Sequence, residues 1–565
     1  MTFRSLLYLV ALGLSPQVSA DVFVSSSGQE FYETHTIFEP ANNQEVKDLL
    51  QKVYDGLKEE DPSLAPIAVG AGGFYLKDHW QGLSFGAHAH GNKNQPLLRT
   101  VKLKKKTLTP EDYVFDKEKR TILLKVKGGN TQEETLALAN SILDKETRKH
   151  NEFFLIGPSS GRVTIAGAIA AHAHYRSTYP YGGYFFDQVE NFTLIAMQDG
   201  KPTEIFCSRE VNAELFHSIP GSFGRGGIIS DVTIRLELMP KDYKPTLSIT
   251  KISGLENYLQ AFSQSLDSIK QPNLLNDFNR RILGVNTVMT DKFYYIWNFN
   301  FEPASKVKDA PVFEFFDKPG FRTLLAHTTG HAIPFLANSG LDKIIFRKDH
   351  QFYQNDLMSW LFFHDGYLNF LEAFPWMKAP LLVPKYMFTF IFGEHPGERL
   401  FGKDTMETAH QVYMMKREHF AEFMRFYTEL LKIPKFQMMG FKCRDFVPLP
   451  ATKTLMSPAH SENLNDVFMA VTLSWPVHSE ADKKLINELK ERIIALDYVK
   501  LHPLKEFDVN SDVLQKLYAG QSQQLESILL RNRIDDSMIW TKLKKALYGI
   551  PNPLQASNEK YSLDF

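Results

Sequence analysis

Cysteine is scarce in this 565-residue chain, which contains only 2. This excludes a small domain held by several disulfides and a zinc module with cysteine ligands. An excess of one charge is also lacking, because 64 Lys and Arg balance 65 Asp and Glu. A protein that neutralises phosphates needs a clear basic excess, so we expect no nucleic-acid partner. The chain has no internal repeat or low-complexity tract, and its composition excludes a disordered chain, a collagen and a coiled coil.

The first 20 residues have the pattern of a cleaved secretory signal peptide. Arg4 provides a positive start, Leu6 to Leu14 is an apolar run, and Val18-Ser19-Ala20 precedes Asp21. The apolar run is short for a membrane span. The alternatives are an uncleaved anchor or a buried first helix. We therefore expect an exported protein, either periplasmic or secreted.

The chain from 21 to 245 alternates short β-rich runs with helical periodicity, which predicts an α+β domain of the nucleotide-binding type. We expect helices over Asn43–Leu57 and Thr131–Leu143, and strands over Thr34–Glu39, Val189–Gln198 and Ile228–Leu238. The segment between Pro240 and Pro245 is the expected domain boundary.

A separate α+β substrate (cap) domain is expected over 246–495, and helical stretches such as Leu255–Ile269 and Lys416–Leu431 dominate its pattern. The segment 351–395 holds 13 aromatic residues. It is either the core of the substrate domain or a region that touches an apolar substrate or a membrane surface peripherally.

Three segments contain glycine and other small residues: Gly70-Ala71-Gly72-Gly73, then 163–190, then 221–236. Glycines let backbone N–H groups surround an anion such as pyrophosphate. Ala166, Gly167 and Ala168 allow a flat ligand to approach the backbone. Gly227-Ile228-Ile229 could offer backbone hydrogen bonds to a base edge.

In their order these motifs resemble the FAD-binding PCMH-type domain, the family of vanillyl-alcohol oxidase and p-cresol methylhydroxylase, over about 200 residues. The resemblance implies a two-subdomain FAD-binding domain with FAD as cofactor. The cofactor-binding residues that it implies are Gly70, Ala71, Gly72, Gly73, Phe74, Tyr75, Asp78, Gln81, Thr164, Gly167, Ala168, Ala170, His174, Gly227, Ile228 and Ile229.

Within that family the pattern is closest to decaprenylphosphoryl-ribose oxidases and sugar-1,4-lactone oxidases. Asp78 and Gln81 match their R-S-Y-G-D-x-x-Q motif, whereas Phe74 differs from it. Many members of the wider family place the flavin-linking histidine where Phe74 stands, so the resemblance implies non-covalent FAD. His88 and His90 are the alternative attachment points.

The C-terminal segment resembles the same oxidases. Val499 to Lys505 looks like the stretch that ends in a substrate-site lysine, and the closing pattern up to Leu547 implies that 496–565 returns to the FAD domain. Lys505 is therefore the candidate substrate-activating residue and His502 a second candidate base, with a surface lysine as the alternative. His174 falls beside the flavin in this family. The pairs His88/His90 and His172/His174 lack further ligands nearby, so no metal is expected.

These observations predict an FAD-linked oxidase or dehydrogenase that acts on the CH–OH group of a sugar, polyol or sugar-lipid. Hydride would pass to flavin N5, and oxygen or another acceptor would reoxidise the flavin. The alternatives are an FAD-dependent reductase of an apolar, sterol-like substrate and a non-catalytic protein that kept the fold.

Overall fold

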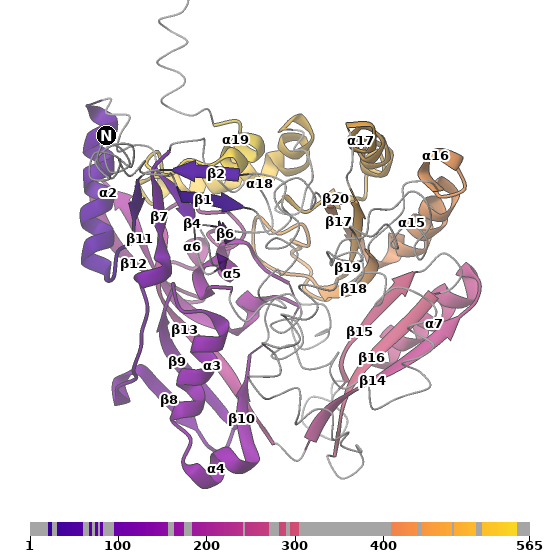
Figure 1. Cartoon of the computed structure of the whole chain (residues 1–565), viewed down its shortest axis with the longest axis horizontal. Helices are drawn as coiled ribbons and strands as arrows, with labels where there is room; N and C mark the ends of the chain where they lie inside the picture. Colours follow the sequence, from indigo (N-terminus) through magenta and orange to yellow (C-terminus); the bar gives the residue numbers. More distant parts are fainter. Residues whose placement is uncertain are drawn as a thin grey trace, which may run out of the picture.

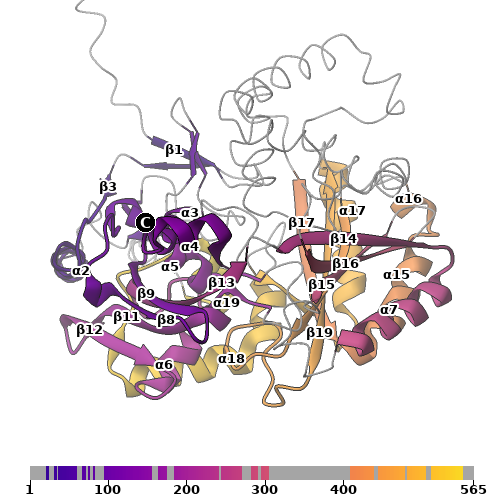
Figure 2. The ribbon, with the colours of Figure 1, turned by 90° about the horizontal axis from the view of Figure 1, so that it is seen from below.

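The computed structural model describes residues 21–24, 31–34, 36–59, 67–70, 74–76, 80–82, 95–155, 163–174, 183–240, 243–269, 282–289, 294–303, 408–437, 443–476, 480–503 and 511–550. The predicted signal peptide, the aromatic segment 351–395, His88, His90 and Lys505 lie outside the described residues. The fold is α+β, as the sequence predicts. Two halves lie side by side, and the C-terminal helices lie against the first half (Figures 1 and 2).

The first half is built on an antiparallel sheet with the strand order β12-β11-β13-β9-β8, to which β10 and β21 add at β13 and β11. The predicted strand Val189–Gln198 is confirmed as β11, and the strand from Ile228 extends as β13 to Pro240. The other strands are β8 (Tyr113–Asp116), β9 (Thr121–Lys127), β10 (Asn151–Phe154), β12 (Lys201–Ser208) and β21 (Ile534–Asp535). The helices of this half include α3 (Gln132–Ser141), α4 (Lys145–His150), α5 (Ile165–Ala170) and α6 (Ala213–Ser218).

A small parallel sheet with the order β3-β7-β4 lies at one end of the first half, beside helix α2 (Asn43–Lys58). Its strands are β3 (Ile37–Phe38), β4 (Ala68–Gly70) and β7 (Leu97–Arg99). The expected strand Thr34–Glu39 is wrong as a single element, because the chain forms β2 up to Thr34 and begins β3 only at Ile37. Asn42 caps α2 by accepting a hydrogen bond from the Glu45 N–H, which confirms the predicted helix start.

A further sheet has the order β2-β1-β6-β5 and contains part of the predicted cofactor motif. Its strands are β1 (Asp21–Val24), β2 (Phe31–Thr34), β5 (Phe74–Leu76) and β6 (Trp80–Gly82). In the hairpin of β5 and β6, Tyr75 lies opposite Gln81 and Phe74 lies opposite Gly82. The backbone of Phe74, Tyr75 and Gln81 is therefore held in a paired ribbon.

The described part of the second half contains a sheet with the order β14-β16-β15-β18-β19-β17-β20, which the sequence did not predict. Its strands are β14 (Tyr243–Ile252), β15 (Ile282–Met289), β16 (Tyr294–Pro303), β17 (Thr408–Lys416), β18 (Cys443–Pro450), β19 (Val467–Pro476) and β20 (Lys500–Leu501). Among these strands, β16 contains Asn and β17 contains Gln and Met, whereas β14, β15 and β19 contain several β-branched residues. The pairing of the strands depends on neighbours elsewhere in the chain.

The predicted helices of this half are confirmed as α7 (Leu255–Ile269) and α15 (Arg417–Leu430), which lie side by side on one face of the sheet. Arg425 of α15 forms a two-pronged ion pair with Glu256 of α7, with N–O distances of 2.8 and 2.7 Å. Helices α16 (Pro434–Gln437) and α17 (Glu480–Ile494) follow. The opposite face of the sheet packs on Tyr184 of the first half through a cluster of buried side chains: Val412, Met414, Val447, Leu449, Ala451, Ala459, Phe468 and Ala470.

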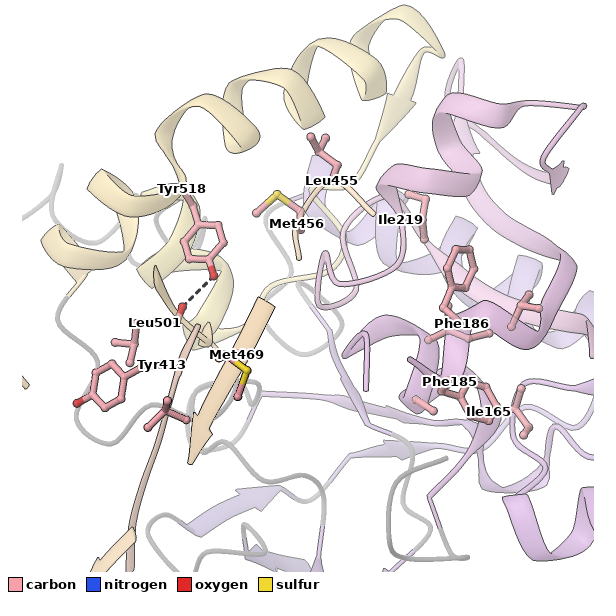
Figure 3. Packing of buried hydrophobic residues seen from close by; sticks show 14 of the residues in the cluster. Ile165, Phe185, Phe186, Ile219, Tyr413, Leu455, Met456, Met469, Leu501 and Tyr518 are labelled. Atoms are coloured by element: carbon pink, nitrogen blue, oxygen red, sulfur yellow. Dashed lines mark hydrogen bonds between the residues drawn. The ribbon is translucent and has the colours of Figure 1, made fainter. Parts of the chain in front are cut away.

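The C-terminal segment consists of α18 (Ser511–Arg531), β21 and α19 (Lys542–Tyr548), and it touches both halves. Strand β21 pairs with β11 of the first sheet. The Tyr518 hydroxyl of α18 donates to the Leu501 carbonyl beside the second sheet, at 2.8 Å. Figure 3 shows Leu455 and Met456 between α18 and Ile219 of the first half. Within the described ranges, no helix has the length and apolarity needed to span a membrane.

Candidate cofactor and proton-transfer site

Three turns of the chain converge at one end of the first sheet: the turn after β9, the start of α5 and the start of β13. The Ala166 N–H donates to the Gly128 carbonyl at 2.9 Å, and the Ile165 N–H donates to the Asn130 carbonyl at 2.8 Å. Thr164 caps α5 by accepting from the Gly167 N–H at 3.2 Å. The structure thus holds Thr164, Gly167 and Ala168, which the sequence assigned to the cofactor, against a turn that the sequence did not assign.

The unassigned turn depends on two glycines. A Cβ on Gly128 would lie 2.3 Å from the Ile229 carbonyl oxygen, and a Cβ on Gly129 would lie 1.9 Å from the Thr100 carbonyl oxygen. Only glycine allows the three backbones to approach this closely. The sequence signal was present, because a Gly-Gly pair follows the β-branched run of β9 and precedes the helix capped by Thr131.

Gly227, Ile228 and Ile229 begin β13 in this neighbourhood. A Cβ on Gly227, whose φ is +148°, would lie 2.3 Å from the Ile195 carbonyl oxygen. The side chains of Ile228 and Ile229 are 3% and 4% exposed, and both residues pair with β11. Any ligand contact from these three residues would therefore use backbone N–H or C=O groups that do not hydrogen-bond to β11.

The end of the parallel sheet adds the start of the first glycine motif. Gly70 ends β4 and lies opposite Arg99 at the end of β7. Thr100 follows, is 4% exposed, and its Oγ1 has no hydrogen-bond partner within the described residues. Ala71, Gly72, Gly73 and Asp78 lie outside the described residues. The carboxyl end of a parallel sheet is a common place for a phosphate-bearing ligand, and an orphaned buried hydroxyl here fits such a group.

A buried ion network fixes the turn that leads into β13. Arg225, only 3% exposed, donates from Nε to Asp536 Oδ2 and from Nη2 to Glu526 Oε2, each at 2.6 Å. Lys544 Nζ lies 3.3 Å from Asp536 Oδ2. Burial raises the pKa of Asp536, but Lys544 and Arg225 outweigh this and leave it below its ordinary value. The C-terminal segment is thereby tied to the turn before Gly227.

His174 and His502 meet at the junction of the two halves. His174 follows α5 and pairs in an isolated bridge with Tyr184. His502 follows β20, is 3% exposed, and its N–H donates to the Val412 carbonyl at 2.8 Å. The two ring centroids are 5.8 Å apart. Two candidates that are 328 positions apart in the sequence (502 − 174) thus come together in the structure.

His172 differs from its neighbour in the His-x-His pair. Its φ is +43°, which places it in a left-handed turn. The ring is buried and stacks on Tyr184, with ring centroids 4.2 Å apart. Burial lowers the pKa of His172 to about 3, so the ring stays neutral near pH 7. The described residues contain no group of three or more metal-ligating side chains.

The comparisons with known proteins give one short match. No protein-family model matches the chain. The chain is 30% identical over 82 residues to cytokinin dehydrogenase 3 of Arabidopsis thaliana. This match covers 14% of the chain and 15% of the relative, so the chain spans a small part of the curated relative it matches. The similarity gives coarse support to an oxidoreductase of the PCMH flavoprotein type.

Proposed function

We propose that the protein is an FAD-dependent oxidoreductase that oxidises the CH–OH group of a sugar, polyol or sugar-lipid after export from the cytoplasm. The observation that carries this proposal is the junction of the two halves, where the ring centroids of His502 and of His174, which follows α5, are 5.8 Å apart. The short match to a dehydrogenase supports the reaction class.

The residues present fit an extended phosphate-bearing cofactor. Gly70, Thr100 and the backbone of the turns at Gly128 and Gly227 would hold it, since these positions combine close backbone approach with an unpartnered buried hydroxyl. The cofactor would accept hydride from the substrate carbon when bound. Phe74 offers no nucleophile for a covalent link, so attachment would be non-covalent.

The chain's own contribution would be to remove the hydroxyl proton and orient the alcohol. An imidazole is the side chain best suited to accept a proton near neutral pH, and two stand together at the junction. The backbone N–H of His502 donates to the Val412 carbonyl, which fixes the backbone position from which the ring projects. By its resemblance to sugar oxidases, Lys505 would stabilise the developing alkoxide.

The test begins with the visible absorption spectrum of the mature protein before and after acid precipitation. A flavin spectrum that moves to the supernatant supports non-covalent FAD. Colour that stays in the pellet contradicts the assignment at Phe74 and favours His88 or His90. A colourless protein that gains no spectrum with added FAD favours the non-catalytic alternative.

Substrate class is then tested anaerobically, by bleaching of the bound flavin with sugar alcohols and a cytokinin and by reoxidation of the reduced flavin with an unsaturated sterol. Bleaching by the alcohols supports the proposal, whereas bleaching by the cytokinin alone contradicts the substrate class. His502→Asn and His174→Asn should each slow bleaching by about 10²-fold or more while the bound flavin spectrum persists. The matched control is His419→Asn on α15, which should bleach at the wild-type rate.

A further inference from the structure

Several polar side chains with buried atoms lie where the loop 451–466 meets α18. Thr454 is 1% exposed, and its Oγ1 has no hydrogen-bond partner within the described residues. The same holds for Ser522 Oγ and His460 Nδ1, which are both inaccessible to solvent. A buried polar atom without a partner costs free energy. Such atoms in one region of the fold therefore point to a missing ligand group.

Hydrogen bonds hold these residues together. The Gln521 amide nitrogen on α18 donates to the Leu455 carbonyl at 2.5 Å and to the Ser457 carbonyl at 3.2 Å. The His460 N–H donates to the Ser457 carbonyl at 3.1 Å, which closes the same loop. These hydrogen bonds join α18 to the loop through Gln521, which precedes Ser522, and through Leu455, which follows Thr454.

Lys500 adds a positive charge to this region. Its Nζ contacts Gln521 Oε1 at 3.4 Å, and no carboxylate of the described residues lies within ion-pair distance of it. Burial lowers the pKa of Lys500. Burial also lowers the pKa of His460, and the charge of Lys500 contributes to that lowering. Glu462, whose side chain is 94% exposed, lies 3.9 Å from Nε2, the other ring nitrogen of His460.

Lys500 lies on β20, the strand that leads into His502. Lys500 and His502 are two residues apart along β20 and its continuation, so their side chains leave the same face of the sheet. Lys500 is opposite Met414, a member of the cluster that packs on Tyr184. This face is the one that the second sheet turns toward the first half.

We propose that Lys500, Thr454 and Ser522 form a binding site for a small oxyanion, a carboxylate or phosphate group carried by the substrate. An ammonium and two hydroxyls would donate to the anion, whereas the His460 ring already hydrogen-bonds to the backbone of Thr454 and Lys453. The assignment of the anion to the substrate rests on the proposed function, whereas the anion site itself does not.

The test is isothermal titration of the mature full-length protein with inorganic phosphate, in a buffer free of other oxyanions. Wild type should bind saturably, and Lys500→Met should weaken binding by at least about tenfold, as expected for a lost charge-assisted hydrogen bond. Thr454→Val and Ser522→Ala should weaken it less. The control Lys453→Met removes the same charge from an exposed position in the loop and should leave binding unchanged.

Two results would overturn the site: no saturable binding by wild type, or an equal loss in Lys453→Met and Lys500→Met. Thermal unfolding supplies a second measurement. Without phosphate, Lys500→Met should unfold at the wild-type temperature or above it, because it removes a partly buried charge that has no carboxylate partner among the described residues. A lower midpoint would make Lys500 a structural residue and refute the proposal.

The origin of the anion is tested separately. Acetate and phosphate titrations compare the two oxyanion chemistries, and the tighter one identifies the group preferred. Phosphate should raise the KM of a reactive substrate without changing kcat if the anion belongs to the substrate. Phosphate binding by a protein that takes up no flavin would contradict the proposed function alone, and flavin uptake without phosphate binding would contradict this site alone.

Discussion

Replacing Asp536 by Asn removes the negative charge at the centre of the network that ties the C-terminal segment to the turn before β13. Asp536 lies 2.6 Å from Arg225 Nε and 3.3 Å from Lys544 Nζ, and the side chains of these two cations are 3% and 5% exposed. Neither cation can regain water without local unfolding. Loss of one partner from a buried ion pair costs about 3–5 kcal/mol, so we expect Asp536→Asn to lower the free energy of unfolding by that amount.

The matched control is Glu526→Gln, which removes the other carboxylate on Arg225. The Glu526 side chain is 50% exposed, so solvent screens its interaction and the expected cost is about 0–1 kcal/mol. Urea unfolding followed by far-ultraviolet circular dichroism measures both variants, with the slope m held in common. Equal costs for the two variants, or a loss below about 1 kcal/mol for Asp536→Asn, would refute the assignment of Asp536 as the central charge.

The remaining predictions concern acid stability and the glycine turns. The pKa of Asp536 is lowered in the folded state, so its contribution to stability is present above the unfolded pKa and is lost as the pH falls through the folded pKa. The free energy of unfolding of Asp536→Asn should therefore depend less on pH in the acid range than that of the wild type. Gly128→Ala places a Cβ 2.3 Å from the Ile229 carbonyl oxygen, so it should lower the free energy of urea unfolding by about 1–3 kcal/mol. It should also lower the amount of FAD that the protein retains on ultrafiltration. Thr100→Val should leave stability unchanged or improved, because the Oγ1 has no partner, yet weaken FAD binding in a fluorescence titration; unchanged FAD affinity would contradict its place in the site.

The elements that the sequence predicted correctly carry their signal within a few residues. Helix α2 has an asparagine cap and apolar spacing near 3.6, and α7 matches its predicted bounds Leu255–Ile269. The strands of the second sheet carry a weaker local signal, because short apolar runs such as β19 fit a strand or a buried helix equally well. For example, β17 contains Gln411 and Met414, and it is a strand because β19 and β20 pair with it. Such pairing joins segments that are distant along the chain, which a local pattern cannot reveal.

The residues of the candidate site likewise fall into those that the sequence identified and those that only the structure reveals. The family resemblance named His174 and His502, and the fold brings their rings together across the junction of the two halves. It did not name Gly128, because two glycines after a strand are common and only the 2.3 Å approach to Ile229 shows why they are needed. Thr100 was also missed, since an unpartnered hydroxyl is a property of the packed structure and leaves no trace in the sequence.

His172 and His174 show why residue spacing alone is a weak guide at this junction. Alternate residues share a face on a strand, and that geometry would present both rings to one ligand. The φ of +43° at His172 instead puts a left-handed turn there and buries its ring on Tyr184. His174, after the turn, meets His502 from the other half of the molecule. A proton-transfer site built this way needs both sheets in place, so changes that separate the halves should abolish turnover before they release a cofactor held by the first half alone.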